Sequence, residues 1–102
     1  MINVLIYDDN QKDIEHLSKC LYKFFEKKEL QYQINICEGR EDLLQKIKQS
    51  DLLFLDMEIN GESGIDLGLE LQNMNHDCRI IITTNYSKYA IDGYKIHADR
   101  YF

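Results

Sequence analysis

The stretch DLLFLD, residues 51–56, places four consecutive apolar residues between two acids. A run of this kind is typical of a strand that is buried on both faces, as in a parallel sheet covered by helices. Two more stretches have a similar character, INVLIY at residues 2–7 and RIIITT at residues 79–84. We therefore predict that these segments are strands of one mostly parallel sheet.

The segments between these strands carry the period of amphipathic helices. Helices are expected over residues 11–28, 41–49 and 65–73, with a further strand at residues 32–37. Ser87 fits the N-cap of a helix that reaches about residue 96, and residues 100–102 fit the opening of a fifth strand. The inward side of the first helix is predicted to hold Ile14, Leu17, Leu21, Phe24 and Phe25. This alternation predicts an α/β fold, a doubly wound parallel sheet, in one domain over residues 1–102.

The composition limits the classes of function. With 44% hydrophobic residues the chain can form a core, and no apolar stretch approaches the roughly 18 residues that span a bilayer. The start of the chain lacks the basic flank of a secretory signal, so we expect a soluble, cytoplasmic protein. A formal charge of −6 argues against nucleic-acid binding by this domain itself.

The cysteines and histidines give no sequence signal for a site. Cys20, Cys37 and Cys78 lie far apart without a CxxC spacing, so buried, reduced thiols are expected. The three histidines show no ligand spacing with one another or with the cysteines, so they are interpreted as surface or helix residues: His16, His76 and His97.

Acidic and hydroxyl side chains stand where three of the predicted strands end: Asp8 and Asp9 after the first, Asp56 after the third, and Thr83 and Thr84 after the fourth. The carboxyl ends of parallel strands form the edge of the sheet where ligands bind. Close carboxylates repel one another, and a hard cation with oxygen ligands, such as Mg²⁺, relieves that repulsion. Asp56 ends the most apolar strand and precedes a glycine-containing loop, so it is the best candidate for a carboxylate that attacks phosphorus.

Each of these residues also has a plain structural interpretation. An Asp pair before a helix commonly caps its N-terminus, and a single Asp after a strand is commonly a turn residue. Thr84 also fits β-branched packing in its strand. All four positions fall at the ends of predicted parallel strands, and this coincidence favours a shared site.

The same residues lie in segments that carry a family pattern: LLFLDMEINGESGIDL (52–67), YDDN (7–10) and RIIITTNYSKYAIDGYKIHADRYF (79–102). Together they resemble the receiver domains of bacterial response regulators in two-component systems, and residues 86–102 especially resemble the LytR/AgrA type. The resemblance implies a flavodoxin-like (CheY-like) sheet with strand order 2-1-3-4-5. It also implies a LytTR-type DNA-binding output domain beyond this chain.

The resemblance implies a role for each matching residue of the cation site. Asp56 matches the aspartate that a sensor histidine kinase phosphorylates, and Asp9 matches the direct Mg²⁺ ligand. Asp8 matches the outer carboxylate that acts through water. Glu58 matches the position whose backbone carbonyl completes the coordination and whose side chain tunes the lifetime of the phosphoryl group. Such a domain catalyses its own phosphorylation and dephosphorylation.

The remaining matches concern signalling. Thr84 matches the hydroxyl residue that moves to the bound phosphoryl group, and Tyr101 matches the aromatic residue that turns inward with it.

Three departures from the family pattern stand out: Asn60 replaces a common proline, Asn85 replaces a small residue, and the family's active-site lysine would follow Phe102. We expect a chain cut before the domain's last helix, which would expose apolar surface and favour dimers.

Two other functions compete with this interpretation. One is a phosphorylation-independent interaction module with a receiver fold, in which a tyrosine-rich stretch forms a partner or dimer face: Tyr86, Tyr89, Tyr94 and Tyr101. The same tyrosines also fit ordinary helix and strand packing. The other is a phosphatase of the haloacid dehalogenase type, which requires DxD after the first strand, whereas this strand ends in adjacent Asp8 and Asp9.

Overall fold

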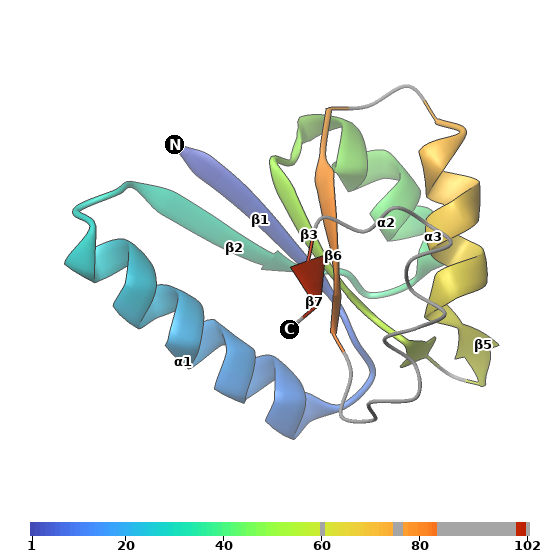
Figure 1. The fold of residues 1–102 in the computed structure, drawn as a ribbon, viewed down its shortest axis with the longest axis horizontal. Helices are drawn as coiled ribbons and strands as arrows, with labels where there is room; N and C mark the ends of the chain where they lie inside the picture. The colour runs from blue at the N-terminus through green and yellow to red at the C-terminus, as the bar shows by residue number, and fades with distance from the viewer. Residues whose placement is uncertain (60, 75–76, 84–99, 102) are drawn as a thin grey trace.

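A five-stranded parallel sheet forms the centre of the molecule, seen in a computed structural model that describes residues 1–59, 61–74, 77–83 and 100–101 (Figure 1). The strand order is β2-β1-β3-β6-β7, and each neighbouring pair runs parallel. The strands are β1 (Ile2–Tyr7), β2 (Tyr32–Ile36), β3 (Leu52–Asp56), β6 (Arg79–Thr83) and β7 (Arg100–Tyr101). Counted along this sheet alone, the order is 2-1-3-4-5, which confirms the predicted flavodoxin-like fold.

Helices lie on both faces of the sheet (Figure 1). One face carries α1 (Gln11–Lys27), and the other carries α2 (Arg40–Lys46), the short 3₁₀ helix η1 (Ile47–Gln49) and α3 (Gly64–Gln72). Successive side chains of a strand point to opposite faces. Accordingly, Val4 and Ile6 of β1 pack with the α1 residues, while Leu5 and Tyr7 belong to the cluster beneath α2 and α3.

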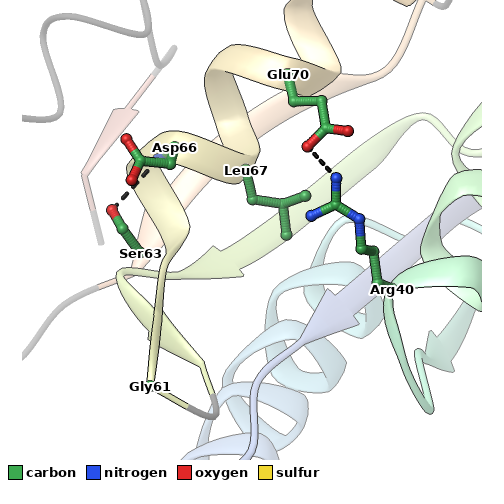
Figure 2. Close-up of a pocket in the computed structure, with 6 residues that line it drawn as sticks. All are labelled: Arg40, Gly61, Ser63, Asp66, Leu67 and Glu70. Carbon is green, nitrogen blue, oxygen red and sulfur yellow. Dashed lines mark hydrogen bonds and ion pairs between the residues drawn. The ribbon is translucent and has the colours of Figure 1, made fainter.

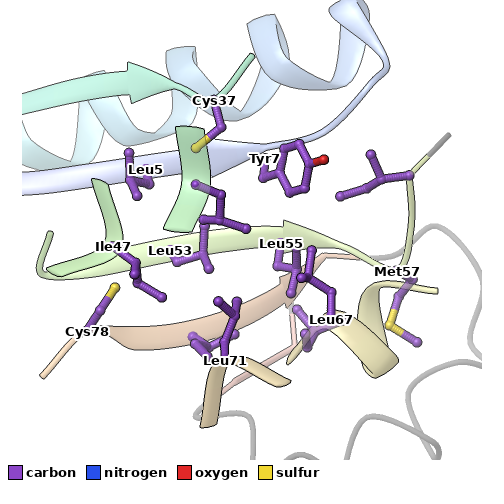
Figure 3. Close-up of a cluster of buried hydrophobic side chains, with 14 residues drawn as sticks. Leu5, Tyr7, Cys37, Ile47, Leu53, Leu55, Met57, Leu67, Leu71 and Cys78 are labelled. Carbon is purple, nitrogen blue, oxygen red and sulfur yellow. The ribbon is translucent and has the colours of Figure 1, made fainter. Parts of the chain in front are cut away.

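The core is therefore split by the sheet into two apolar clusters. The larger one combines Leu53 and Leu55 of β3 with Ile47, Leu67 and other residues of the helices on that face of the sheet (Figure 3). Cys37 and Cys78 are buried in this cluster and form no disulfide, whereas Cys20 on α1 is partly exposed. No helix in the described ranges has both the length and the apolar character needed to cross a membrane.

Three local features differ from the sequence prediction. Phe24, expected to face inward, leaves 52% of its surface exposed, while Phe25 is buried. The segment before the third helix contains a small antiparallel hairpin, β4 (Glu58–Ile59) and β5 (Glu62–Ser63). The helix itself begins one residue early, at Gly64, because the Ser63 side chain accepts a hydrogen bond from the Asp66 backbone N–H and caps it. The helix predicted after Ser87 lies outside the described residues.

Candidate functional site

Asp8, Asp9 and Asp56 converge at the carboxyl edge of the sheet. Strands β1 and β3 are parallel neighbours with Tyr7 opposite Leu55, so the residues that follow them lie at the same edge. One ligand atom from each of the three carboxylates lies within 4.8 Å of the others. The convergence predicted from the strand ends is therefore observed for all three acids.

The cap of α1 is a different residue from the acidic pair. Asn10 is the N-cap, and its side-chain oxygen accepts a hydrogen bond of 3.1 Å from the Asp13 backbone N–H. The Asn10 backbone N–H in turn donates to Asp8 Oδ1 at 2.8 Å, which orients that carboxylate. The structural alternative, in which the Asp pair caps the helix, is wrong, because Asn10 caps it instead.

Burial and mutual repulsion perturb the acids. The pKa of Asp56 is raised to about 7, first by burial and next by the negative charge of Asp8, against the opposing effect of a hydrogen bond from the Glu58 backbone. The pKa of Asp8 is also raised, mainly by burial, against the hydrogen bond from Asn10. Ionising all three carboxylates near neutral pH therefore costs free energy. Binding of a divalent cation would offset this cost. An all-oxygen donor set that is half open to solvent fits a hard cation.

The backbone that carries Asp56 is held closely by the start of α3. The Gly64 N–H donates to the Met57 carbonyl oxygen at 2.6 Å, and the Met57 N–H donates to the Thr83 carbonyl oxygen at 3.1 Å. A Cβ atom added to Gly64 would lie 1.9 Å from the Asp56 carbonyl oxygen, which leaves no room for any side chain. The sequence indicated only a glycine loop here and did not predict this contact.

The other predicted site residues have different outcomes. Glu58 is the exposed first residue of β4, and its side chain is not part of the carboxylate cluster; coordination by its carbonyl stays a prediction. Thr83 lies opposite Asp56 in the register of β3 and β6, whereas Thr84 lies outside the described residues. Tyr101 is placed by its backbone in β7, opposite Ile82.

A cleft of about 360 Å³ lies between the start of α2 and α3, and is lined by Arg40, Gly61, Ser63, Asp66, Leu67 and Glu70 (Figure 2). An ion pair between Arg40 and Glu70 joins the two helices across it, and Leu67 points into it. None of the three converging aspartates lines this cleft. The ion pair therefore links α2 to α3, and the cleft is separate from the carboxylate cluster.

Comparison with known sequences gives a consistent result. Residues 4–102 match the family described as the response regulator receiver domain. The chain is 31% identical over 98 residues to the sensory transduction protein LytT of Bacillus subtilis, and 32% identical over 100 residues to the transcriptional regulatory protein LytR of Staphylococcus aureus. These alignments cover 96% and 98% of this chain but 40% of each relative. The chain thus spans about two fifths of the length of these relatives.

Solved structures agree with the fold. The response regulator protein TrrA from Thermotoga maritima, in complex with Mg²⁺ and BeF, superposes with a TM-score of 0.78 at 32% identity, over 99% of this chain and 84% of TrrA. The structure of TrrA in complex with the histidine kinase ThkA superposes with a TM-score of 0.75, at 32% identity over 100% of this chain and 84% of that one.

Proposed function

This chain belongs to the response regulator receiver domain family, and we propose that residues 1–102 act as a receiver unit in which Asp56 accepts a phosphoryl group from a sensor histidine kinase in a Mg²⁺-dependent reaction. The convergence of the Asp8, Asp9 and Asp56 carboxylates within 4.8 Å is the observation that carries the proposal. A kinase partner is supported by the relative TrrA, which has been seen with the histidine kinase ThkA.

The proposed chemistry is transfer to a carboxylate oxygen. An ionised Asp56 oxygen forms the new bond to phosphorus while the bond from phosphorus to the donor nitrogen of the kinase histidine breaks, and the released electron pair stays on that nitrogen. Bound Mg²⁺ would supply positive charge against the carboxylates and the phosphoryl oxygens. In the later hydrolysis, a water oxygen would bond to phosphorus as the bond to the Asp56 oxygen breaks, which releases inorganic phosphate and restores the carboxylate.

The supporting residues are assigned distinct roles. Asp9, the exposed member of the cluster, is proposed as the direct cation ligand, and Asp8 as the carboxylate that acts through water. The hydrogen bond from Asn10 supports this role for Asp8, because it occupies Oδ1 and restrains the side chain. The carbonyl oxygen of Glu58 is proposed to complete the coordination.

The signalling step is proposed from the family resemblance. Thr84 would bind the phosphoryl group on Asp56, and Tyr101 would respond by changing the surface near it. The register supports this pairing, because Thr83 lies opposite Asp56 and β6 pairs with the strand of Tyr101. We propose that the output is transcriptional, through a LytTR-type DNA-binding domain, as the name of the relative LytR suggests.

Phosphorylation by a small donor tests the proposal directly. The folded protein is incubated with acetyl phosphate and Mg²⁺, and intact-mass and peptide mass spectrometry are used to locate an acid-labile adduct. We expect one phosphoryl group on Asp56, lost in Asp56→Asn and retained in Asp77→Asn, whose exposed carboxyl is not part of the cluster. A folded wild-type domain that forms no adduct would favour the phosphorylation-independent module instead.

A further inference from the structure

Strand β2 has one edge that no described segment pairs with. It stands first in the sheet order and pairs with β1 (Figure 1). Beside the two ends of β2, the Gln31 carbonyl oxygen accepts a hydrogen bond from β1 and the Cys37 N–H donates one to it, both at 2.9 Å. A parallel strand directs the peptide groups of alternate residues toward its neighbour. The intervening residues Tyr32, Ile34 and Ile36 therefore direct their N–H and carbonyl groups outward.

This edge has none of the features that commonly keep sheet edges from pairing, which are charged side chains, proline and bulges. The sequence of β2, YQINI, contains no charged residue and no proline. Its register with β1 is continuous, so the strand has no bulge. No residue of β2 is buried, and Ile36 leaves 37% of its surface exposed. Another strand can therefore approach the full length of this edge.

We propose that two copies of this chain pair through β2, antiparallel about a two-fold axis at Ile34, so that one sheet continues across both molecules. In an antiparallel ladder, alternate opposite residues exchange two hydrogen bonds. This axis places Ile34 opposite itself and Tyr32 opposite Ile36 of the second copy. Every outward peptide group of the strand then gains a partner. Because both copies use the same edge, the assembly closes as a dimer.

The side chains of β2 also match one another about this axis. Tyr32 and Ile34 pack on the α1 face of the sheet, and strand alternation places Ile36 on the same face. Pairing covers the exposed Ile36 with Tyr32 of the second copy. On the other face, Gln33 lies opposite Asn35 of the second copy. Residues paired in this way have Cα atoms about 4.5 Å apart, so their amide groups can hydrogen-bond.

A cavity of about 300 Å³ lies on that other face and is lined partly by Gln33 and Asn35. Leu5, Lys46 and Ser50 contribute to its wall. Within the described residues, neither the Gln33 nor the Asn35 side chain hydrogen-bonds to another part of the chain. Both amide groups are therefore available to the second copy, and the cavity leaves room for them to adjust.

The charges favour a second copy over a charged peptide as the occupant of this edge. An uncharged strand offers no ion pair to an acidic or basic segment, whereas a second β2 meets it without electrostatic cost. Each whole chain has a formal charge of −6, so the two copies repel one another away from the strand. One short strand from each copy is expected to bury less than the roughly 1,200 Å² of a stable interface. The dimer should therefore be weak and should tighten as salt screens the repulsion.

Analytical ultracentrifugation over a range of protein concentrations tests the proposal, with Mg²⁺ present and no phosphodonor. The wild type should show a monomer–dimer equilibrium whose affinity rises with NaCl concentration. Ile36→Lys should weaken dimerisation about tenfold or more, because it places a charge in the paired edge. Leu69→Lys is the matched control: Leu69 lies on α3, is 38% exposed, and its substitution changes the net charge equally. This control should dimerise as the wild type does.

Two double variants test the register of the pairing. One combines Gln33→Lys with Asn35→Lys, and the other combines Gln33→Glu with Asn35→Glu. Like charges directly opposite one another destabilise a strand pair, and opposite charges stabilise it. Each double variant alone should therefore be monomeric, whereas an equimolar mixture of the two should form a heterodimer.

Several results would overturn the proposal. They are a wild type that is still monomeric at about 1 mM, where a dimer with a dissociation constant of that size would be populated, assemblies that grow beyond the dimer, equal dimerisation of Ile36→Lys and Leu69→Lys, or dimers of either double variant alone. Circular dichroism checks that each variant is folded. Asp56→Asn should dimerise as the wild type does, so failure here is distinguishable from failure of the phosphoacceptor proposal.

Discussion

Gly64 packs directly against the backbone of Asp56: a Cβ atom at position 64 would lie 1.9 Å from the Asp56 carbonyl oxygen and 2.9 Å from the Met57 Cα. Both contacts are with backbone, which cannot rotate away as a flexible side chain can. Together with the hydrogen bond from the Gly64 N–H to Met57, this contact sets the distance between α3 and the end of β3. The candidate acceptor is thus positioned by a residue eight places further along the chain.

Gly64→Ala is therefore expected to displace the Asp56 segment. Overpacking of this kind destabilises by about 1–3 kcal/mol, and we expect slower phosphorylation of Asp56 by acetyl phosphate at temperatures where the variant is folded. Gly39→Ala is the matched control, since its Cβ would meet nothing within 4 Å. Urea denaturation and the phosphorylation rate check the prediction. Equal behaviour of the two variants would contradict it.

The residue after the C-cap of α1 offers a stabilising change. Glu29 has a φ of 57°, and Leu30 N–H donates to the Phe25 carbonyl oxygen, as in a helix end closed by a left-handed residue. Glycine adopts this conformation without the Cβ penalty, and a carboxylate at a helix C-terminus is electrostatically unfavourable. Glu29→Gly should raise the free energy of unfolding by about 0.5–1 kcal/mol. Lys28→Gly, at a φ of −87°, should lower it instead.

Asp51 joins the amino ends of three strands. Its Oδ2 accepts the Asn3 N–H at 2.7 Å, its N–H donates to the Asn3 carbonyl oxygen, and its carbonyl oxygen accepts the Arg79 N–H. Asp51→Ala removes only the side-chain bond and leaves the Asn3 N–H without it, so we expect a loss of about 1 kcal/mol. Thermal denaturation, with Asp77→Ala as an exposed acidic control, measures this loss. No difference between the two variants would refute the role of the bond.

The raised pKa of Asp56 predicts a pH dependence of stability. Between its ordinary value of 3.8 and about 7, the folded protein holds a proton that the unfolded chain has released. Without a divalent cation, stability should therefore fall as pH rises through this window, and the raised pKa of Asp8 acts in the same direction. Mg²⁺ competes with that proton, so the stabilisation it gives should grow as pH rises toward about 7 and level off above it.

Thermal melts with and without Mg²⁺, from about pH 5 to about pH 8, check this dependence. Asp56→Asn should flatten the slope of the metal-free protein and remove most of the Mg²⁺ effect. A metal-free wild type that becomes more stable across the same range would show that the carboxylates do not repel as described.

The sequence by itself determined the strands, their parallel arrangement and the three acids at their ends. A strand with a continuous apolar run, such as residues 52–55, avoids water only when both of its faces are buried. Parallel strands bring their carboxyl ends to one edge of the sheet. These are properties of local pattern, and the sheet order and the position of Asp8, Asp9 and Asp56 confirm them.

The tertiary structure decided what depends on contacts between distant residues. Burial by the packed sheet and the charge of Asp8 raise the pKa of Asp56, and no sequence pattern states how much solvent a carboxylate keeps. The contact of Gly64 with Asp56 and the ion pair between Arg40 and Glu70 likewise arise only when the helices are docked. Phe24 and Phe25 are adjacent in the sequence, and the placement of α1 on the sheet left the first exposed and buried the second.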